Sequence, residues 1–281
     1  MNRPPAIELQ DLRCGYRGRV VLDVPRLEIS PGEFTAVIGP NGSGKTTLAR
    51  VISGVIPPYS GVARVNGRDI SRLSPRARAR ALAVVNQSVE ALDMPLEDYV
   101  LMGRHPHRPP YRFFETAAEI SLARENIRLT GLLPGNTPLD RLSGGERQMA
   151  AIARALTQQT GILLLDEPTA HLDIAHQVKI LDLARRLNRE RGVTIVLIIH
   201  DLNLASEYAD RLVLLDRGAL LVSGAPFEVL TPSLVESVYH TPVTVLPSPF
   251  SGRPFIFPAP GDSALHPPAS TVPVSRWQRK P

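Results

Sequence analysis

The chain has 281 residues, a formal net charge of +5 and a pI near 9.7. Apolar residues make up 43% of it, enough for an ordinary core, but its longest apolar run, residues 193–199, is far too short to cross a bilayer, which needs roughly 20 residues. Its N-terminus lacks the apolar stretch of a signal peptide, and its single cysteine, Cys14, excludes an internal disulfide and a cysteine metal cluster, so we expect a soluble, intracellular protein.

The predicted elements begin with strands. Short strands separated by Gly and Pro, typical of an antiparallel sheet, are predicted at residues 7–12, 20–22, 27–29 and 63–65. Residues 35–38 form an apolar strand that runs into a glycine-rich loop, and residues 46–53 continue as a helix. An antiparallel sheet therefore precedes or flanks the start of an α/β core.

A short basic helix is predicted next, with Ser74 and Pro75 at its start. Arginines are concentrated at Arg72, Arg76, Arg78 and Arg80. They fit either a solvated face or a contact with anionic lipid headgroups. Because nothing in the chain matches a DNA- or RNA-binding motif, we expect no nucleic-acid partner despite the basic charge.

The middle of the chain predicts a helical subdomain over residues 94–139, with helices at 96–102 and 115–132. Strands follow at 162–165 and 193–199, and the helix between them has Asp173 as its expected N-cap. From residue 247 onward Pro, Ser and Gly dominate. We predict one domain over 6–246 and a largely disordered tail over 247–281.

The glycine-rich loop fits the pattern G-x-x-x-x-G-K-[ST], whose backbone N–H groups can surround a triphosphate. Glycine lets the backbone approach the phosphate oxygens closely, and the helix that follows adds a favourable dipole. Lys45 is placed to neutralise the β- and γ-phosphates, and the Thr46 hydroxyl to ligate Mg²⁺. The predicted phosphate-binding residues are Gly39, Pro40, Asn41, Gly42, Ser43, Gly44, Lys45, Thr46 and Thr47.

Two adjacent acids, Asp166 and Glu167, end an apolar strand. In an open α/β sheet this is the edge where ligands bind. Asp166 is expected to hold Mg²⁺, and Glu167 to orient and deprotonate the attacking water.

A second glycine-rich segment, Leu142-Ser143-Gly144-Gly145-Glu146, precedes a helix about 20 residues before the acidic strand. Ser143 is a suitable N-cap, and the glycines leave the first N–H groups of the helix free to meet an anion.

With these motifs the chain resembles the nucleotide-binding subunit of an ATP-binding-cassette (ABC) transporter over residues 6–240. The resemblance implies a P-loop NTPase core with an N-terminal antiparallel β subdomain and an inserted helical subdomain. It identifies residues 142–146 with the family signature, Gln87 with the glutamine loop, and His200 with the switch histidine that binds the γ-phosphate. Asp173 would end the D-loop, and Tyr16 would stack on adenine.

The same resemblance implies a head-to-tail homodimer in which each ATP lies between the Lys45 loop of one subunit and the signature of the other. Ser143 and Gly145 would then contact the partner's nucleotide, with Gly144 between them. Lys45, Glu167 and His200 would be the catalytic residues, and Thr46, Gln87 and Asp166 the Mg²⁺ site. His171 departs from the small residue that is commonest at its position, and no catalytic role is assigned to it.

Residues 94–107, 172–177 and 200–205 resemble the corresponding segments of importers for iron chelates, haem and cobalamin. That family pairs the subunit, on the cytoplasmic face of the inner membrane, with a permease and a periplasmic or extracellular substrate-binding protein. ATP binding would close the dimer and drive the permease between its states, and hydrolysis would reset it. Residues near 88–112 would hold part of the permease in a groove.

Other functions stay open at this point. A soluble ABC-type ATPase that is not coupled to transport would share the motifs, although such proteins usually carry two cassettes or a long coiled-coil insert. A nucleotide-binding regulator without hydrolysis is disfavoured by Glu167. The cargo, including the possibility of another metal, is not specified by this chain.

Overall fold

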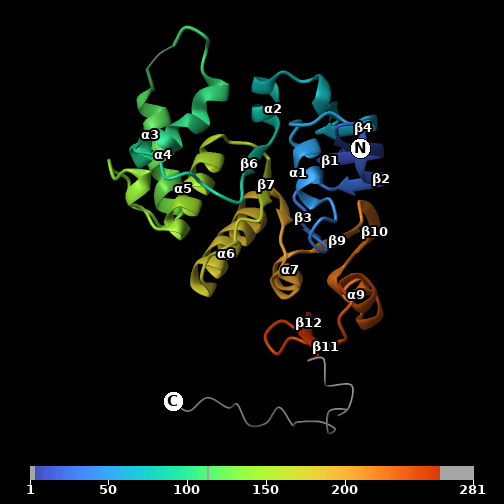
Figure 1. Cartoon of the computed structure of the whole chain (residues 1–281). Helices are drawn as coiled ribbons and strands as arrows, with labels where there is room; N and C mark the ends of the chain where they lie inside the picture. Colours follow the sequence, from blue (N-terminus) through green and yellow to red (C-terminus); the bar gives the residue numbers. More distant parts are fainter. Residues whose placement is uncertain (1–3, 113, 260–281) are drawn as a thin grey trace, which may run out of the picture.

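The computed structural model describes residues 4–112 and 114–259. Within them, a ten-stranded curled sheet has the strand order β5-β4-β1-β2-β10-β9-β3-β8-β7-β6 (Figure 1). Its strands are β1 (Ile7–Tyr16), β2 (Arg19–Ile29), β3 (Phe34–Ile38), β4 (Ser60–Val65), β5 (Arg68–Asp69), β6 (Ala83–Val85), β7 (Ile162–Asp166), β8 (Thr194–Ile198), β9 (Arg211–Asp216) and β10 (Ala219–Gly224).

The parallel half of the sheet, β6-β7-β8-β3-β9, is apolar on both faces, as expected for strands covered on both sides. In β3 the side chains of Ala36 and Ile38 join one core cluster, whereas Val37 joins the other. This alternation follows from the two-residue period of a strand. The parallel α/β core predicted from the sequence is confirmed.

The other half of the sheet is mainly antiparallel, as predicted. The two strands expected at 20–22 and 27–29 are, however, one continuous strand, β2. Pro25 interrupts the sequence pattern but not the strand. It lies opposite Asp11 of β1, which has φ 46°, at a point where the pairing of β1 with β4 shifts register between Gln10 and Arg13. A proline without an N–H is tolerated at such an irregular position.

Helices cover the sheet on both faces. Helix α1 packs against β1 and β4 as well as β7 and β8, inside the curl of the sheet, and α5 to α9 contribute to the core on the other face. The α-helices are α1 (Lys45–Ile52), α2 (Pro75–Ala81), α3 (Leu96–Leu101), α4 (Ala117–Leu129), α5 (Gly144–Thr157), α6 (Ile174–Arg191), α7 (Leu202–Tyr208), α8 (Pro226–Val229) and α9 (Pro232–Tyr239). Three 3-10 turns join them, η1 (Ile70–Arg72), η2 (Met102–His107) and η3 (Leu139–Arg141).

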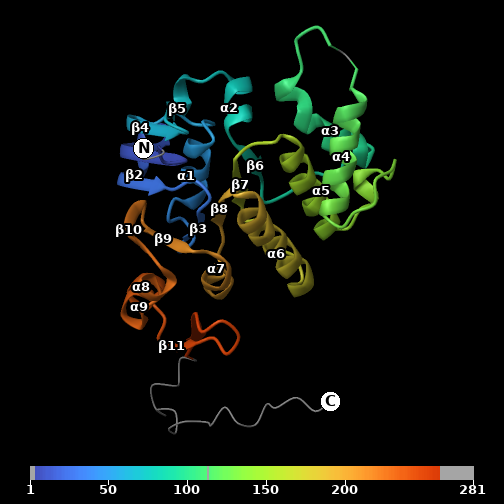
Figure 2. The same cartoon turned by 180° about the vertical axis from the view of Figure 1, so that it is seen from behind.

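Helices α3, α4 and α5 form a helical lobe with its own core, which includes Tyr99, Val100 and Ile127. Figure 2 shows this lobe on one side of the molecule and strands β1, β2 and β4 on the other. The segment predicted as a helical subdomain, 94–139, contributes α3, η2, α4 and η3 to it.

The three arginines of α2 bind carbonyls of the chain, a role that the sequence did not predict. Arg76 and Arg80 both donate to the carbonyl of Pro106 in η2, at 2.9 and 2.7 Å, and Arg78 donates to that of Leu73. The two bonds to Pro106 connect α2 to the helical lobe. Arg72 of η1, which pairs with Asp69 of β5, is exposed, and so is Arg80.

A two-stranded ribbon follows the last helix, with β11 (Val243–Pro247) antiparallel to β12 (Pro254–Pro258). The ordered chain therefore extends past the predicted boundary at 246. Because β12 begins and ends with proline, its composition resembles a loop, but prolines are compatible with a ribbon edge. Residues 260–281 of the predicted tail lie outside the described residues. No helix within the described parts has the length and apolar character to span a membrane.

Candidate nucleotide site

The sheet topology brings four separate loops to one edge. Strands β6, β7, β8 and β3 are parallel neighbours, so the loops after them emerge side by side. These loops carry Gln87, the Asp166–Glu167 pair, His200 and the loop that begins at Gly39. Residues up to 160 positions apart in the sequence therefore share one site.

The loop from Gly39 to Thr47 is shaped by its glycines. Gly39 has φ 149°, and a Cβ there would lie 2.1 Å from the carbonyl oxygen of Leu215. Gly44, with φ 102°, is the residue before α1 and allows the chain to turn into the helix. The loop therefore presents the backbone at the N-terminus of α1, which is suited to bind phosphate.

Lys45 is buried at the start of α1, and its Nζ donates to the carbonyls of Gly39 and Pro40 at 2.8 and 2.9 Å. Burial lowers the pKa of this ammonium group, and the nearby carboxylates of Glu167 and Asp166 oppose that effect. The positive charge is thus fixed directly at the loop that the sequence predicts to hold phosphate.

Glu167 and His200 form a direct pair, with 2.5 Å between Oε1 and Nε2. Glu167 has φ 50°, an uncommon backbone conformation for a residue with a side chain. Its N–H donates to the carbonyl of Ile198 at the end of β8, which fixes the turn after β7 against the neighbouring strand. The acid predicted to activate water is therefore held between two strand ends.

The Oδ1 atom of Asp166 is buried and has no hydrogen-bond partner within the described residues. Burial raises the pKa of this carboxyl, and the adjacent Glu167 raises it further, while Arg50 and Lys45 oppose the rise. A buried carboxylate oxygen without a donor is a strong position for a cation.

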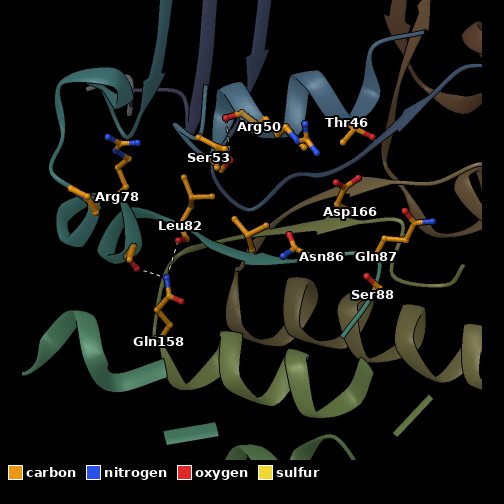
Figure 3. Close-up of a pocket in the computed structure, with 15 residues that line it drawn as sticks. Thr46, Arg50, Ser53, Arg78, Leu82, Asn86, Gln87, Ser88, Gln158 and Asp166 are labelled. Atoms are coloured by element: carbon orange, nitrogen blue, oxygen red, sulfur yellow. Dashed lines mark hydrogen bonds between the residues drawn. The ribbon is translucent and has the colours of Figure 1, made fainter. Parts of the chain in front are cut away.

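Lys45, Glu167 and His200 line a cleft of about 670 Å³, and Asp166 lines the groove beside it. The lining of the cleft includes Asn41, Gly42, Gly44, Lys45, Thr46, Thr47, Gln87, Glu167, Ala170, His171 and His200. A second groove adjoins it and shares Thr46 and Gln87 (Figure 3). Figure 3 shows Thr46, Asp166 and Gln87 at one end of this groove and Arg78 at the other.

The structure does not bring every predicted residue into the cleft. Tyr16 is outside its lining; its hydroxyl accepts a bond from Arg50 at 3.0 Å, and the residue is 39% exposed. Ser143, Gly144 and Asp173 are exposed elsewhere on the surface, and Gly145 is buried beside His176.

Both of those outlying segments are helix starts that the sequence identified. Ser143 forms a capping box with Glu146 at the start of α5, with bonds of 2.8 and 3.3 Å. Asp173 caps α6 by accepting from the N–H of His176 at 2.8 Å.

Two histidines gain importance only from the structure. His171, with φ 61°, lines the cleft. His176, which was not singled out from the sequence, lies between Asp173 and Gly145. The sequence places His176 on the first turn of α6, three residues after the predicted cap Asp173, and this spacing could have identified it as a partner of the Asp173 side chain.

Comparison with known proteins agrees with this geometry. Residues 22–170 match the family model described as ABC transporter. A hemin import ATP-binding protein of Streptomyces coelicolor is 41% identical, covering 88% of this chain and 88% of its own. The ferric enterobactin transport ATP-binding protein of Escherichia coli is 37% identical (89% and 92%), and a cobalamin import ATP-binding protein of Halobacterium salinarum is 38% identical (92% and 67%).

Solved structures have the same fold. An inward-facing metal-chelate type ABC transporter superposes with a TM-score of 0.78 at 26% identity, covering 91% of this chain and 97% of the other. A dimeric ATP-binding cassette in a post-hydrolysis state, bound to ADP and Pi, gives 0.68 at 28% identity, with 78% and 98% covered.

Proposed function

Because the chain belongs to the ABC transporter family, in which it is an ATPase, we propose that it powers an importer for an iron chelate, haem or cobalamin. The observation that carries the proposal is the group of Lys45, Asp166, Glu167 and His200 at one sheet edge. The names of its relatives support the cargo class.

In this proposal the loop from Gly39 to Thr47 binds the phosphates of ATP, and Lys45 neutralises them. Glu167 is the general base toward water. Its hydrogen bond to His200 holds the carboxylate in place, and His200 would bind the outermost phosphate. Tyr16, the last residue of β1, stacks on the adenine in this proposal.

The donor set fits Mg²⁺. The free Oδ1 of Asp166, the exposed hydroxyl side of Thr46 and the amide oxygen of Gln87 are hard oxygen ligands around one groove. When bound, the ion would screen charge on the phosphates. Asp166, Thr46 and Gln87 would orient it, and Gln87 would connect it to the adjoining groove.

The chain acts as a homodimer in this proposal. Ser143, Gly144, Gly145 and Asp173 lie outside the cleft of their own chain, which supports a role at the nucleotide of a second copy. The dimeric ATP-binding cassette of similar fold supports the same arrangement.

The groove of Figure 3 is the proposed docking site for a permease, which in turn receives cargo from a substrate-binding protein. Val55, Leu82 and Val84 give it apolar lining, and Gln87 joins it to the nucleotide cleft. The chain would then lie at the cytoplasmic face of the membrane.

Replacing Glu167 with Gln tests the proposal. We expect the variant to bind ATP, to lose almost all hydrolysis, and to form a stable dimer with ATP but not ADP, measured by light scattering. Adding Ser143→Arg should abolish the dimer while each chain still binds ATP. Normal hydrolysis by Glu167→Gln would refute the role of the base, and an ATP-bound variant that stays monomeric would refute the dimer.

A further inference from the structure

His176 connects the two outlying segments. On the side of α6, its Nδ1 lies 2.9 Å from both carboxylate oxygens of Asp173, the residue that caps the helix. The backbone N–H of His176 makes a separate bond of 2.8 Å to the same carboxylate. The imidazole is thus fixed to the Asp173 turn by a bond that the helix cap does not need.

On the side of α5, the same ring covers Gly145. A Cβ built on Gly145 would lie 2.2 Å from Cδ2 and 2.6 Å from Cγ of His176. The ring cannot move away to make room without breaking its bond to Asp173. Gly145 is therefore a glycine for a reason within its own chain, since no larger residue fits beside this imidazole.

Charged side chains also lie near the His176 ring. Glu146, the next residue of α5, lines the same cavity as His176, together with Lys179 one turn along α6. Hydrogen bonds from Ser143 lower the pKa of Glu146, and His176 contributes in the same direction. The hydrogen bond to Asp173 requires a proton on Nδ1, which the imidazolium and one neutral tautomer both carry.

We infer that His176 is a positioning residue that fixes the start of α5 to the Asp173 turn, so that both segments meet a partner's nucleotide site in one arrangement. The inference rests on the proposed dimer. If the two segments moved independently, each would have to become ordered when the dimer closes. The conformational entropy lost in ordering them would weaken the affinity of the dimer. Two segments that are already fixed to each other lose this entropy when the chain folds, before the dimer forms.

The experiment uses the Glu167→Gln chain and measures the ATP concentration that gives half-maximal dimer. His176→Ala removes the ring but leaves the Asp173 cap to the backbone, so α6 should still form. We expect it to raise the required ATP about tenfold, as for loss of a hydrogen bond to a charged group. His176→Phe, which keeps a ring and loses the donor, should raise it similarly.

His176→Asn retains a side-chain donor near the position of Nδ1 and should restore part of the affinity. Lys179→Ala, on the same face one turn on, is the matched control and should leave dimer formation unchanged. ADP binding to each monomer should be the same in all variants, because His176 is outside the cleft of its own chain.

Dimer formation by the His176→Ala and His176→Phe chains at the ATP concentration of the parent would overturn the inference. So would an equal loss of ADP binding, because it would indicate general damage. Dimer formation by the Glu167→Gln parent is measured before any His176 variant is made. If the parent stays monomeric with ATP, the proposed dimer is refuted, and the role of His176 is refuted with it.

Discussion

The identity of Glu167 as a candidate catalytic acid follows from local sequence, but its conformation depends on neighbouring strands. Its place after an apolar strand identified it as an acid at a sheet edge. Its positive φ and its 2.5 Å contact with His200 depend on β8 lying beside β7. Identity came from local sequence, whereas orientation came from strand order.

The role of Lys45 in nucleotide binding can be tested by a single substitution. Lys45→Ala should weaken nucleotide binding roughly 10- to 100-fold, because it removes a charge-assisted contact with phosphate. The fold should persist, since Nζ bonds only to the carbonyls of its own loop. Titration with a fluorescent ATP analogue measures the effect, with Lys179→Ala as control. Unchanged affinity would show that Lys45 does not contact the nucleotide.

At the scale of elements, helix starts were the most predictable feature. Ser74, Ser143 and Asp173 all precede helices and accept from their first N–H groups. A cap acts through residues two or three positions away, so a short stretch of sequence suffices. The capping box of α4, Thr116 with Glu119, has the same form, although the helix was predicted to begin at 115.

The charge of Glu119 can be tested apart from the box, because Gln at this position still forms the box. Burial by itself would raise the pKa of the Glu119 carboxyl, but bonds from Thr116 and Arg112 outweigh burial and lower it. A lowered pKa means that the carboxylate stabilises the fold above its ordinary pKa of 4.5, and that this contribution is lost as pH falls through and below that value.

Glu119→Gln should therefore lower the free energy of unfolding by about 1–3 kcal/mol at neutral pH, and by less in acid. Urea denaturation at about pH 7 and about pH 4 measures both values. Glu125→Gln, on the exposed side of the same helix, should change stability by less than about 0.5 kcal/mol. An equal effect of the two substitutions would contradict a stabilising role for the charge of Glu119.

At the scale of the whole molecule, the ribbon β11–β12 is fastened to α7. Asn203 exchanges two bonds with the backbone of Ile256, and Ser206 donates to the carbonyl of Pro254 at 2.7 Å. Ile256 is 6% exposed and belongs to the core that includes Ala205. The ribbon is therefore part of the folded domain.

A chain that ends at Pro247 should be less stable than one that ends at Ala259. We expect the shorter chain to melt roughly 5 °C lower, because it loses a buried Ile and the bonds to α7. Differential scanning calorimetry of the two truncated chains measures the difference in melting temperature. Equal melting temperatures would mean that β12 adds nothing to the stability of the domain.

The sequence by itself determined the nucleotide loop, the acid pair, the helix caps and the alternation of strands and helices, because each depends on residues close together in the chain. It also identified the family, through motifs of fixed spacing. Only the tertiary structure decided that Gln87, Glu167, His200 and Lys45 share one cleft, since strand order is a long-range property. The same holds for the single strand through Pro25, the binding of the α2 arginines to η2, and the contact of His176 with Gly145. In each case the partner lies far along the chain, where local pattern carries no information about it.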